Sequence, residues 1–288
     1  MTKNFHIHHY PIFEKGIFAK HPALFNRFSD HIPDHLRKKY QQTRETLLKY
    51  EGTITWPALV GPGFCGATHP GAENIFIAIM VSSNNFIYNS DCLYVNPSKR
   101  VFAISDSPGV TTSSRKLFVK LNDDLQTGSP DEMETILNDL NKNIGIDNSA
   151  TLSLLYFPKN NSDNRFDKAL AFIAGDSYLF HGNIFQRRMT SIEGKPEFFG
   201  MPHINLEPKL IELVEGDFFV IASDGISSIR LNDREARLEE ILWDQINGDL
   251  EHFVFNAIKN CNRSFEETIF NRAITRFGGD DNVSVLLV

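Results

Sequence analysis

The chain has 288 residues, of which 41% are hydrophobic and 23% are charged, and its formal net charge is −7. This composition supports one large hydrophobic core and excludes an intrinsically disordered chain. The negative charge disfavours the phosphate backbone of nucleic acids, so we expect no nucleic-acid partner.

The cysteines and the lack of long apolar stretches predict a cytoplasmic protein. The three cysteines, Cys65, Cys92 and Cys261, form no C-x-x-C pair, which argues against a disulfide framework and a structural zinc site. The longest apolar run, residues 75–81, is too short to span a membrane, and the N-terminal residues lack the apolar stretch of a signal peptide.

Residues 1–55 differ in character from the rest and are predicted to form a partly helical N-terminal extension. Residues 6–9 hold three histidines that alternate as in a strand, with an exposed polar edge favoured over a metal site. Residues 34–50 carry the thin apolar face of a helix, and glycines and prolines at 52–63 indicate a loop. We therefore place the main domain at residues 56–288.

Apolar runs of strand length recur through the main domain. Several are apolar on both faces, as expected for sheets that are covered on both sides. The clearest strands are predicted at residues 75–81, 101–104, 151–156, 169–174, 218–222 and 283–288.

Helices are predicted between these strands. The strongest signal covers residues 130–143, with Ser129 as the N-cap, Pro130 at the first helical position and Gly145 as the stop. Its apolar face holds Met133, Ile136, Leu137 and Leu140. Further helices are predicted at residues 233–243, 250–260 and 265–276. Strands grouped with helix pairs indicate an α/β or α+β layered domain.

Three aspartates stand at the ends of predicted strands, beside small residues. Asp106 and Asp224 each follow a strand, and Asp281 precedes the last one. A carboxylate at such a place is held by a stiff element and still reaches a cleft. Carboxylate oxygens are the ligands that Mg²⁺ and Mn²⁺ prefer, and a pair of such ions can activate a water and clamp a phosphoryl oxygen.

Five short segments occur in an order that resembles one known family. They are Asn89-Ser-Asp91, Val-Phe-Ala-Ile-Ser-Asp at residues 101–106, Ala174-Gly-Asp-Ser177, Glu-Gly-Asp-Phe-Phe-Val-Ile-Ala-Ser-Asp-Gly at 215–225 and Gly-Asp-Asp-Asn-Val-Ser-Val at 279–285. From about Gly66 to the last residue, the chain resembles a divergent member of the type-2C (PPM) metal-dependent serine/threonine protein phosphatases.

The resemblance implies an α+β fold, a four-layer αββα sandwich of two antiparallel sheets flanked by helix pairs. It implies two Mn²⁺ or Mg²⁺ ions and hydrolysis of phosphoserine and phosphothreonine in a phosphorylated protein substrate by metal-activated water. Asp106 resembles the aspartate that bridges both ions, and Ser107 stands where a glycine coordinates through its carbonyl. Asp224 and Asp281 resemble ligands of the second ion, and Asp91 resembles a carboxylate that holds metal-bound water.

Asp176 resembles an acid that helps to bind a third, weaker ion. Elsewhere the sequence departs from the pattern of the family. Ser90 replaces a glutamate, Ser107 replaces the glycine, and Pro108 replaces a histidine that some members use as a general acid. Ser228 lies where the family has an acid that supports the third ion.

The family often has a basic residue that binds the substrate phosphate, but the matching residues 85–89 of this chain include no basic residue. Arg115, Arg187 and Arg188 are the candidate replacements, because a guanidinium suits phosphate. The stretch between Asp176 and Asp224, which carries a substrate-facing flap in the family, is short. Two alternatives therefore stay open: a phosphodiester-cleaving relative that removes nucleotidyl or phosphocholine groups from proteins, and a pseudophosphatase that acts as a binding or regulatory module.

Overall fold

A computed structural model gives the arrangement of most of the predicted main domain. It describes residues 6–8, 58–61, 63–69, 90–108, 111–159, 166–228 and 282–288. The strand predicted at 75–81 and the helices predicted at 34–50, 233–243, 250–260 and 265–276 lie outside these residues.

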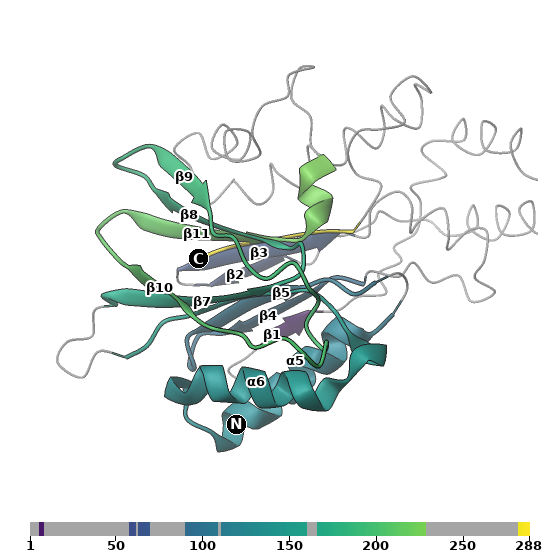
Figure 1. Ribbon diagram of the computed structural model, residues 1–288. Coiled ribbons are helices and arrows are strands. Elements are labelled where there is room, and N and C mark those ends of the chain that lie inside the picture. Colours follow the sequence, from purple (N-terminus) through teal and green to yellow (C-terminus); the bar gives the residue numbers. More distant parts are fainter. Residues whose placement is uncertain are drawn as a thin grey trace, which may run out of the picture.

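The described strands form two antiparallel sheets that stack face to face (Figure 1). Sheet 1 has the order β1 (His6–His8), β4 (Cys92–Asn96), β5 (Val101–Ser105), β6 (Leu152–Tyr156), β7 (Lys168–Ala174) and β10 (Lys209–Glu212). Sheet 2 has the order β2 (Ala58–Gly61), β3 (Phe64–His69), β12 (Val283–Leu287), β11 (Asp217–Ala222), β8 (Tyr178–Asn183) and β9 (Arg188–Ser191). The predicted sandwich of two antiparallel sheets is therefore confirmed.

Five of the six strands predicted in the main domain are confirmed to within a residue at each end, as β5, β6, β7, β11 and β12. The strand-like alternation near the N-terminus is confirmed too, because β1 pairs with β4 at the edge of sheet 1. The sequence segment predicted as an extension thus contributes one strand to the main sheet.

Strands β4, β5 and β6 of sheet 1 are buried on both faces, which explains why they are largely apolar. In β4, Leu93 and Val95 point into the core between the sheets, whereas Cys92 and Tyr94 point toward the helices. The inner core continues across sheet 2 through residues such as Phe219 and Leu286. Side chains alternate along a strand, so a strand covered on both sides needs apolar residues at successive positions.

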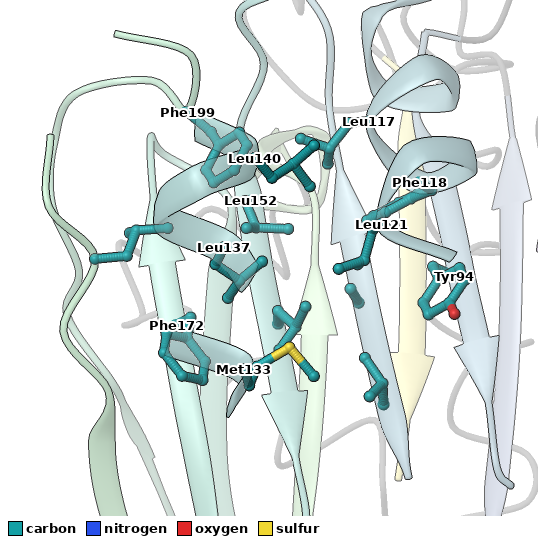
Figure 2. Close-up of a cluster of buried hydrophobic side chains, with 14 of the residues drawn as sticks. Tyr94, Leu117, Phe118, Leu121, Met133, Leu137, Leu140, Leu152, Phe172 and Phe199 are labelled. Carbon is teal, nitrogen blue, oxygen red and sulfur yellow. The ribbon is translucent and has the colours of Figure 1, made fainter. Parts of the chain in front are cut away.

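Two helices, α5 (Ser113–Thr127) and α6 (Met133–Ile144), cover the outer face of sheet 1 (Figure 1). Figure 2 shows Leu117, Phe118 and Leu121 of α5 lying among side chains of α6 and the sheet, all fully buried. The sequence analysis does not predict α5, although Leu117, Leu121 and Leu125 recur at the spacing of a helix face.

The helix predicted at residues 130–143 is confirmed with one difference at its start. Residues 130–132 form a 3₁₀ turn, η1 (Pro130–Glu132), before α6 begins at Met133. The Ser129 hydroxyl accepts the Asp131 N–H at 3.3 Å, so Ser129 caps this turn and not the α-helix. The stop at Gly145 is confirmed, because this residue adopts φ +75°, which favours glycine.

None of the helices in the described part of the chain combines the length and apolarity needed to cross a membrane. Cys92 is a buried free thiol.

Candidate functional site

Strand pairing in sheet 1 brings Asp91 and Asp106 to the same end of the sandwich. Cys92 lies opposite Ser105 in the ladder between β4 and β5. Asp91 immediately precedes Cys92 and Asp106 immediately follows Ser105, so both aspartates lie just beyond this pair. Residues opposite each other on antiparallel strands have Cα atoms about 4.5–5.5 Å apart. Asp91 is fully buried, and Asp106 is half-buried.

The backbone of Asp106 is held on both sides by Thr151. The Asp106 N–H donates to Thr151 Oγ1 at 2.8 Å, and the Thr151 N–H donates to the Asp106 carbonyl at 2.7 Å. The Thr151 hydroxyl also lies 2.5 Å from Ser177 Oγ, and Ser153 Oγ donates to the Ser177 carbonyl at 3.0 Å. These bonds connect the end of β5 to the turn between β7 and β8.

That turn contains Asp176, which is exposed. The preceding Gly175 has φ +84°, and a Cβ atom at this position would meet Thr151 Cγ2 at 2.9 Å. Glycine is therefore required both by the backbone conformation and by the close packing of the turn on Thr151. The turn places Asp176 at the same end of the sandwich as Asp106.

Asp224 reaches this end from sheet 2. It begins the 3₁₀ helix η3 (Asp224–Ser228), directly after β11, and is half-buried. Its neighbour Ser223 donates a hydrogen bond from Oγ to Asp91 Oδ2 at 2.7 Å. The residue beside Asp224 thus contacts the carboxylate of Asp91 across the two sheets.

The segment that contains Asp281 leads to the same place. Asp281 itself lies outside the described residues, but Asn282 is described and buried. Asn282 Oδ1 accepts the Ser90 N–H at 2.8 Å and lies 2.5 Å from Ser90 Oγ. The chain beside Asp281 is therefore bonded to the residue that precedes Asp91.

The structure thus gathers Asp91, Asp106, Asp176 and Asp224 at one end of the sandwich, while Asp281 stays a prediction. Among the described residues, no three His, Cys, Asp or Glu side chains are grouped closely enough to hold a metal ion. The four aspartates at this end offer carboxylate oxygens as donors. This chemistry fits Mn²⁺ or Mg²⁺ better than zinc.

Ser107 has a structural role that the sequence analysis does not predict. Its side chain is buried, and its Oγ accepts the Ser114 N–H at 2.7 Å and lies 2.6 Å from Ser114 Oγ. Ser107 thereby caps the N-terminus of α5, whereas Thr112, at the N-cap position, makes no side-chain capping bond. The side chain of Ser107 thus stabilises α5, while the group expected to bind metal at this position is its backbone carbonyl. Pro108, beside it, is exposed.

Arg115 is the candidate arginine that lies at the same end of the sandwich as Asp106. It follows Ser114 in the first turn of α5 and is exposed. Burial raises the pKa of the Cys92 thiol well above its usual value, the charge of Asp91 raises it further, and the charge of Arg115 lowers it. Arg115 lies where the chain leaves β5 and Asp106 and enters α5.

Arg187 and Arg188 lie at the other end of β8 from the turn that holds Asp176, which disfavours them as phosphate-binding candidates. Strand β8 begins at Tyr178, beside the turn that holds Asp176, and runs away from it to Asn183. At about 3.3 Å per residue, the strand covers roughly 20 Å before the chain reaches either arginine. Both arginines are exposed in the hairpin between β8 and β9.

Three hydroxyl residues of this end, Thr151, Ser177 and Ser223, are missed by sequence reasoning. Ser177 and Ser223 are direct neighbours of predicted site aspartates, and this adjacency is the only signal in the sequence. Thr151 lies 45 residues from its partner Asp106, and nothing in the chain near it indicates the contact.

No protein-family model and no curated protein sequence matches this chain. Solved structures do match it. The photosystem II phosphatase PBCP has a TM-score of 0.55 at 15% sequence identity, over 78% of this chain and 98% of that one. The catalytic domain of the serine/threonine protein phosphatase PstP, in complex with two manganese ions, has a TM-score of 0.52 at 15% identity, over 78% and 96%.

The PPM Ser-Thr phosphatase MsPP from Mycobacterium smegmatis, in complex with cacodylate, is similar to the same degree. Its TM-score is 0.52 at 16% identity, over 78% of this chain and 96% of that chain. The chain thus has the fold of PPM-type serine/threonine phosphatases. The resemblance drawn from its sequence motifs is confirmed at the level of the fold.

Proposed function

We propose that this protein is a Mn²⁺- or Mg²⁺-dependent phosphoprotein phosphatase, a cytoplasmic hydrolase that acts on phosphoserine and phosphothreonine by metal-activated water. The observation that carries the proposal is the meeting of Asp91 and Asp106 from sheet 1 with the Ser223–Asp224 segment from sheet 2. They meet within a fold shared with PstP, whose structure contains two manganese ions.

The proposed ligands follow from the order of the motifs. Asp106, the Ser107 carbonyl, Asp224 and Asp281 would hold the two ions. Asp176, which is exposed in its turn, supports a third and weaker ion. Bound ions would supply an acidified water and would neutralise the charge of the phosphoryl oxygens.

The protein's own residues orient these groups. Thr151 fixes the backbone of Asp106, and Ser223 fixes the carboxylate of Asp91. Pro108 offers no proton, because proline has no ionisable side chain. The position of the family's histidine therefore supplies no proton to the departing oxygen in this chain.

The exposed face of α5 supplies the positive charge for the substrate. Arg115, Lys116 and Lys120 lie along one side of this helix and line a groove of about 330 Å³. A basic groove on a chain with a net charge of −7 suits a phosphorylated, acidic segment of another protein. Arg115 is the residue that we assign to the substrate phosphate, since a guanidinium binds phosphate oxygens in a bidentate manner.

The test is hydrolysis of a phosphothreonine peptide in Mn²⁺, combined with calorimetric titration of Mn²⁺. Asp106→Ala and Asp224→Ala should each reduce turnover by several orders of magnitude. Asp106→Ala should leave the free energy of unfolding of the metal-free protein nearly unchanged, because it relieves repulsion among the carboxylates. Asp139→Ala, which changes an exposed aspartate on α6, is the control and should keep full activity.

The same assay separates the alternatives. Faster turnover of a phosphodiester analogue than of the phosphopeptide would reassign the substrate. A protein that binds neither Mn²⁺ nor Mg²⁺ at millimolar concentration is not an enzyme of this kind, and unchanged activity in Asp106→Ala would contradict the assigned site.

A further inference from the structure

Four buried residues connect the two sheets at the proposed active site. Ser90 and Asp91 precede β4 in sheet 1, Ser223 follows β11 in sheet 2, and Asn282 precedes β12 in sheet 2. The exposed fraction of each residue is 5% or less. We refer to these four residues as the inter-sheet latch.

Two residue pairs of the latch make contacts across the sheets, Ser223 with Asp91 and Asn282 with Ser90. Ser223 Oγ donates to Asp91 Oδ2 at 2.7 Å and accepts the Ser284 N–H at 2.9 Å. Asn282 Oδ1 receives the Ser90 N–H at 2.8 Å and the Ser90 hydroxyl at 2.5 Å. Ser223 Oγ also lies 3.4 Å from the Asn282 carbonyl, so the shorter of the two bonds open to its proton is the one to the Asp91 carboxylate.

The strength of these bonds follows from their setting. The bond from Ser223 to Asp91 has a carboxylate acceptor, and such charge-assisted bonds are shorter and stronger than bonds between neutral groups. All four residues are buried, so water does not replace a bond that is lost. The latch therefore resists changes in the separation of the two sheets at this end.

Three of the four latch residues lie beside a proposed ligand. Ser223 precedes Asp224, Asn282 follows Asp281, and Asp91 stands beside Asp106 in the register of β4 and β5. The proposed ligands come from both sheets, so the distance between the sheets sets the distance between the ligands. Groups that orient metal ligands in this way commonly change metal affinity when they are removed.

We propose that the inter-sheet latch fixes the spacing between Asp106 on sheet 1 and the ligands on sheet 2, and that it thereby sets the affinity of the site for Mn²⁺. Ser223 is a positioning residue in this scheme. Ser90, which stands where the family has a glutamate, holds Asn282 through its hydroxyl and its backbone N–H. The inference rests on the proposed function for the identity of the ion.

The experiment compares two buried serines of sheet 2 by calorimetric titration of the full-length protein with Mn²⁺. Ser223→Ala removes the bond to Asp91. Ser284→Ala is the matched control, because its hydroxyl contacts Thr68 Oγ1 at 2.6 Å and not the latch, while its backbone N–H remains in place. Thermal unfolding without metal is measured for both variants.

We expect Ser223→Ala to bind Mn²⁺ roughly ten- to a hundredfold more weakly than the wild type, and Ser284→Ala to bind it within about twofold of the wild type. The thermal midpoint of metal-free Ser223→Ala should fall further than that of Ser284→Ala, because Ser223→Ala loses both the bond to Asp91 and the bond from the Ser284 N–H, whereas Ser284→Ala loses one hydroxyl bond. Ser223→Thr keeps a hydroxyl and should recover most of the affinity. Ser90→Ala, which keeps the backbone N–H bond to Asn282, should fold in any case and show a smaller loss.

Equal Mn²⁺ affinity in Ser223→Ala and the wild type would overturn the latch, as would an equal loss in Ser284→Ala. A wild-type protein that binds no Mn²⁺ would overturn both the latch and the proposed function. A wild-type protein that binds Mn²⁺ but hydrolyses no phosphopeptide would overturn the proposed function alone, and weaker binding by Ser223→Ala would then still support the latch.

Discussion

Replacement of Ser107 with alanine separates the structural role of this side chain from its proposed role at the metal site. The variant loses the bond from the Ser114 N–H at 2.7 Å and the contact with Ser114 Oγ at 2.6 Å. Loss of a helix cap costs about 1 kcal/mol, and loss of a buried hydroxyl bond costs about 1 kcal/mol more. We therefore expect the free energy of unfolding to fall by about 2 kcal/mol.

For a domain of this size, such a loss lowers the thermal midpoint by roughly 4–8 °C, which calorimetry or circular dichroism resolves. Thr112→Ala is the matched control, because Thr112 occupies the N-cap position of α5 without capping it. This change should alter the free energy of unfolding by less than about 0.5 kcal/mol.

The affinity for Mn²⁺ should stay near the wild-type value in Ser107→Ala, since the proposed ligand is the backbone carbonyl. Three results would refute the reasoning. They are a Thr112→Ala variant as unstable as Ser107→Ala, a Ser107→Ala variant as stable as the wild type, and a large loss of Mn²⁺ affinity without loss of stability.

Two further predictions concern charge. Arg115→Ala should lower kcat/KM for a phosphopeptide roughly ten- to a hundredfold through the loss of a charge-assisted bond, whereas Arg187→Ala should leave it unchanged; equal effects would contradict the assignment of Arg115. Burial raises the pKa of Tyr94 to about 12, although a hydrogen bond from Asn96 opposes this. The folded state thus favours the neutral phenol, so this contribution of about 3 kcal/mol is complete below pH about 10 and is lost as the pH rises through about 12. Urea unfolding between pH about 10 and about 12 should show that the free energy of unfolding declines in the wild type and declines less in Tyr94→Phe. Equal declines in the two proteins would contradict the role of Tyr94.

Several elements of the fold could be predicted from local sequence alone. Strands such as β5 and β11 are apolar on both faces because they are covered on both faces, and this pattern is visible in the chain itself. The end of α6 at Gly145 follows from the backbone conformation that glycine favours. Helix α5 escaped prediction because its capping side chain, Ser107, lies outside the helix and its first turn carries no acidic residue.

Sequence by itself determined the kinds of chemical groups at this site: aspartates at strand ends, in an order that resembles one family of phosphatases. Only the tertiary structure decided which partners hold them and which arginine lies near them. Ser223 meets Asp91 across 132 positions, and Asn282 meets Ser90 across 192. Such contacts depend on strand register and on the stacking of two sheets, and neither leaves a local pattern in the chain. The topology places Arg187 and Arg188 beyond the far end of β8 and Arg115 in the first turn of α5, the helix that follows Asp106 in the chain.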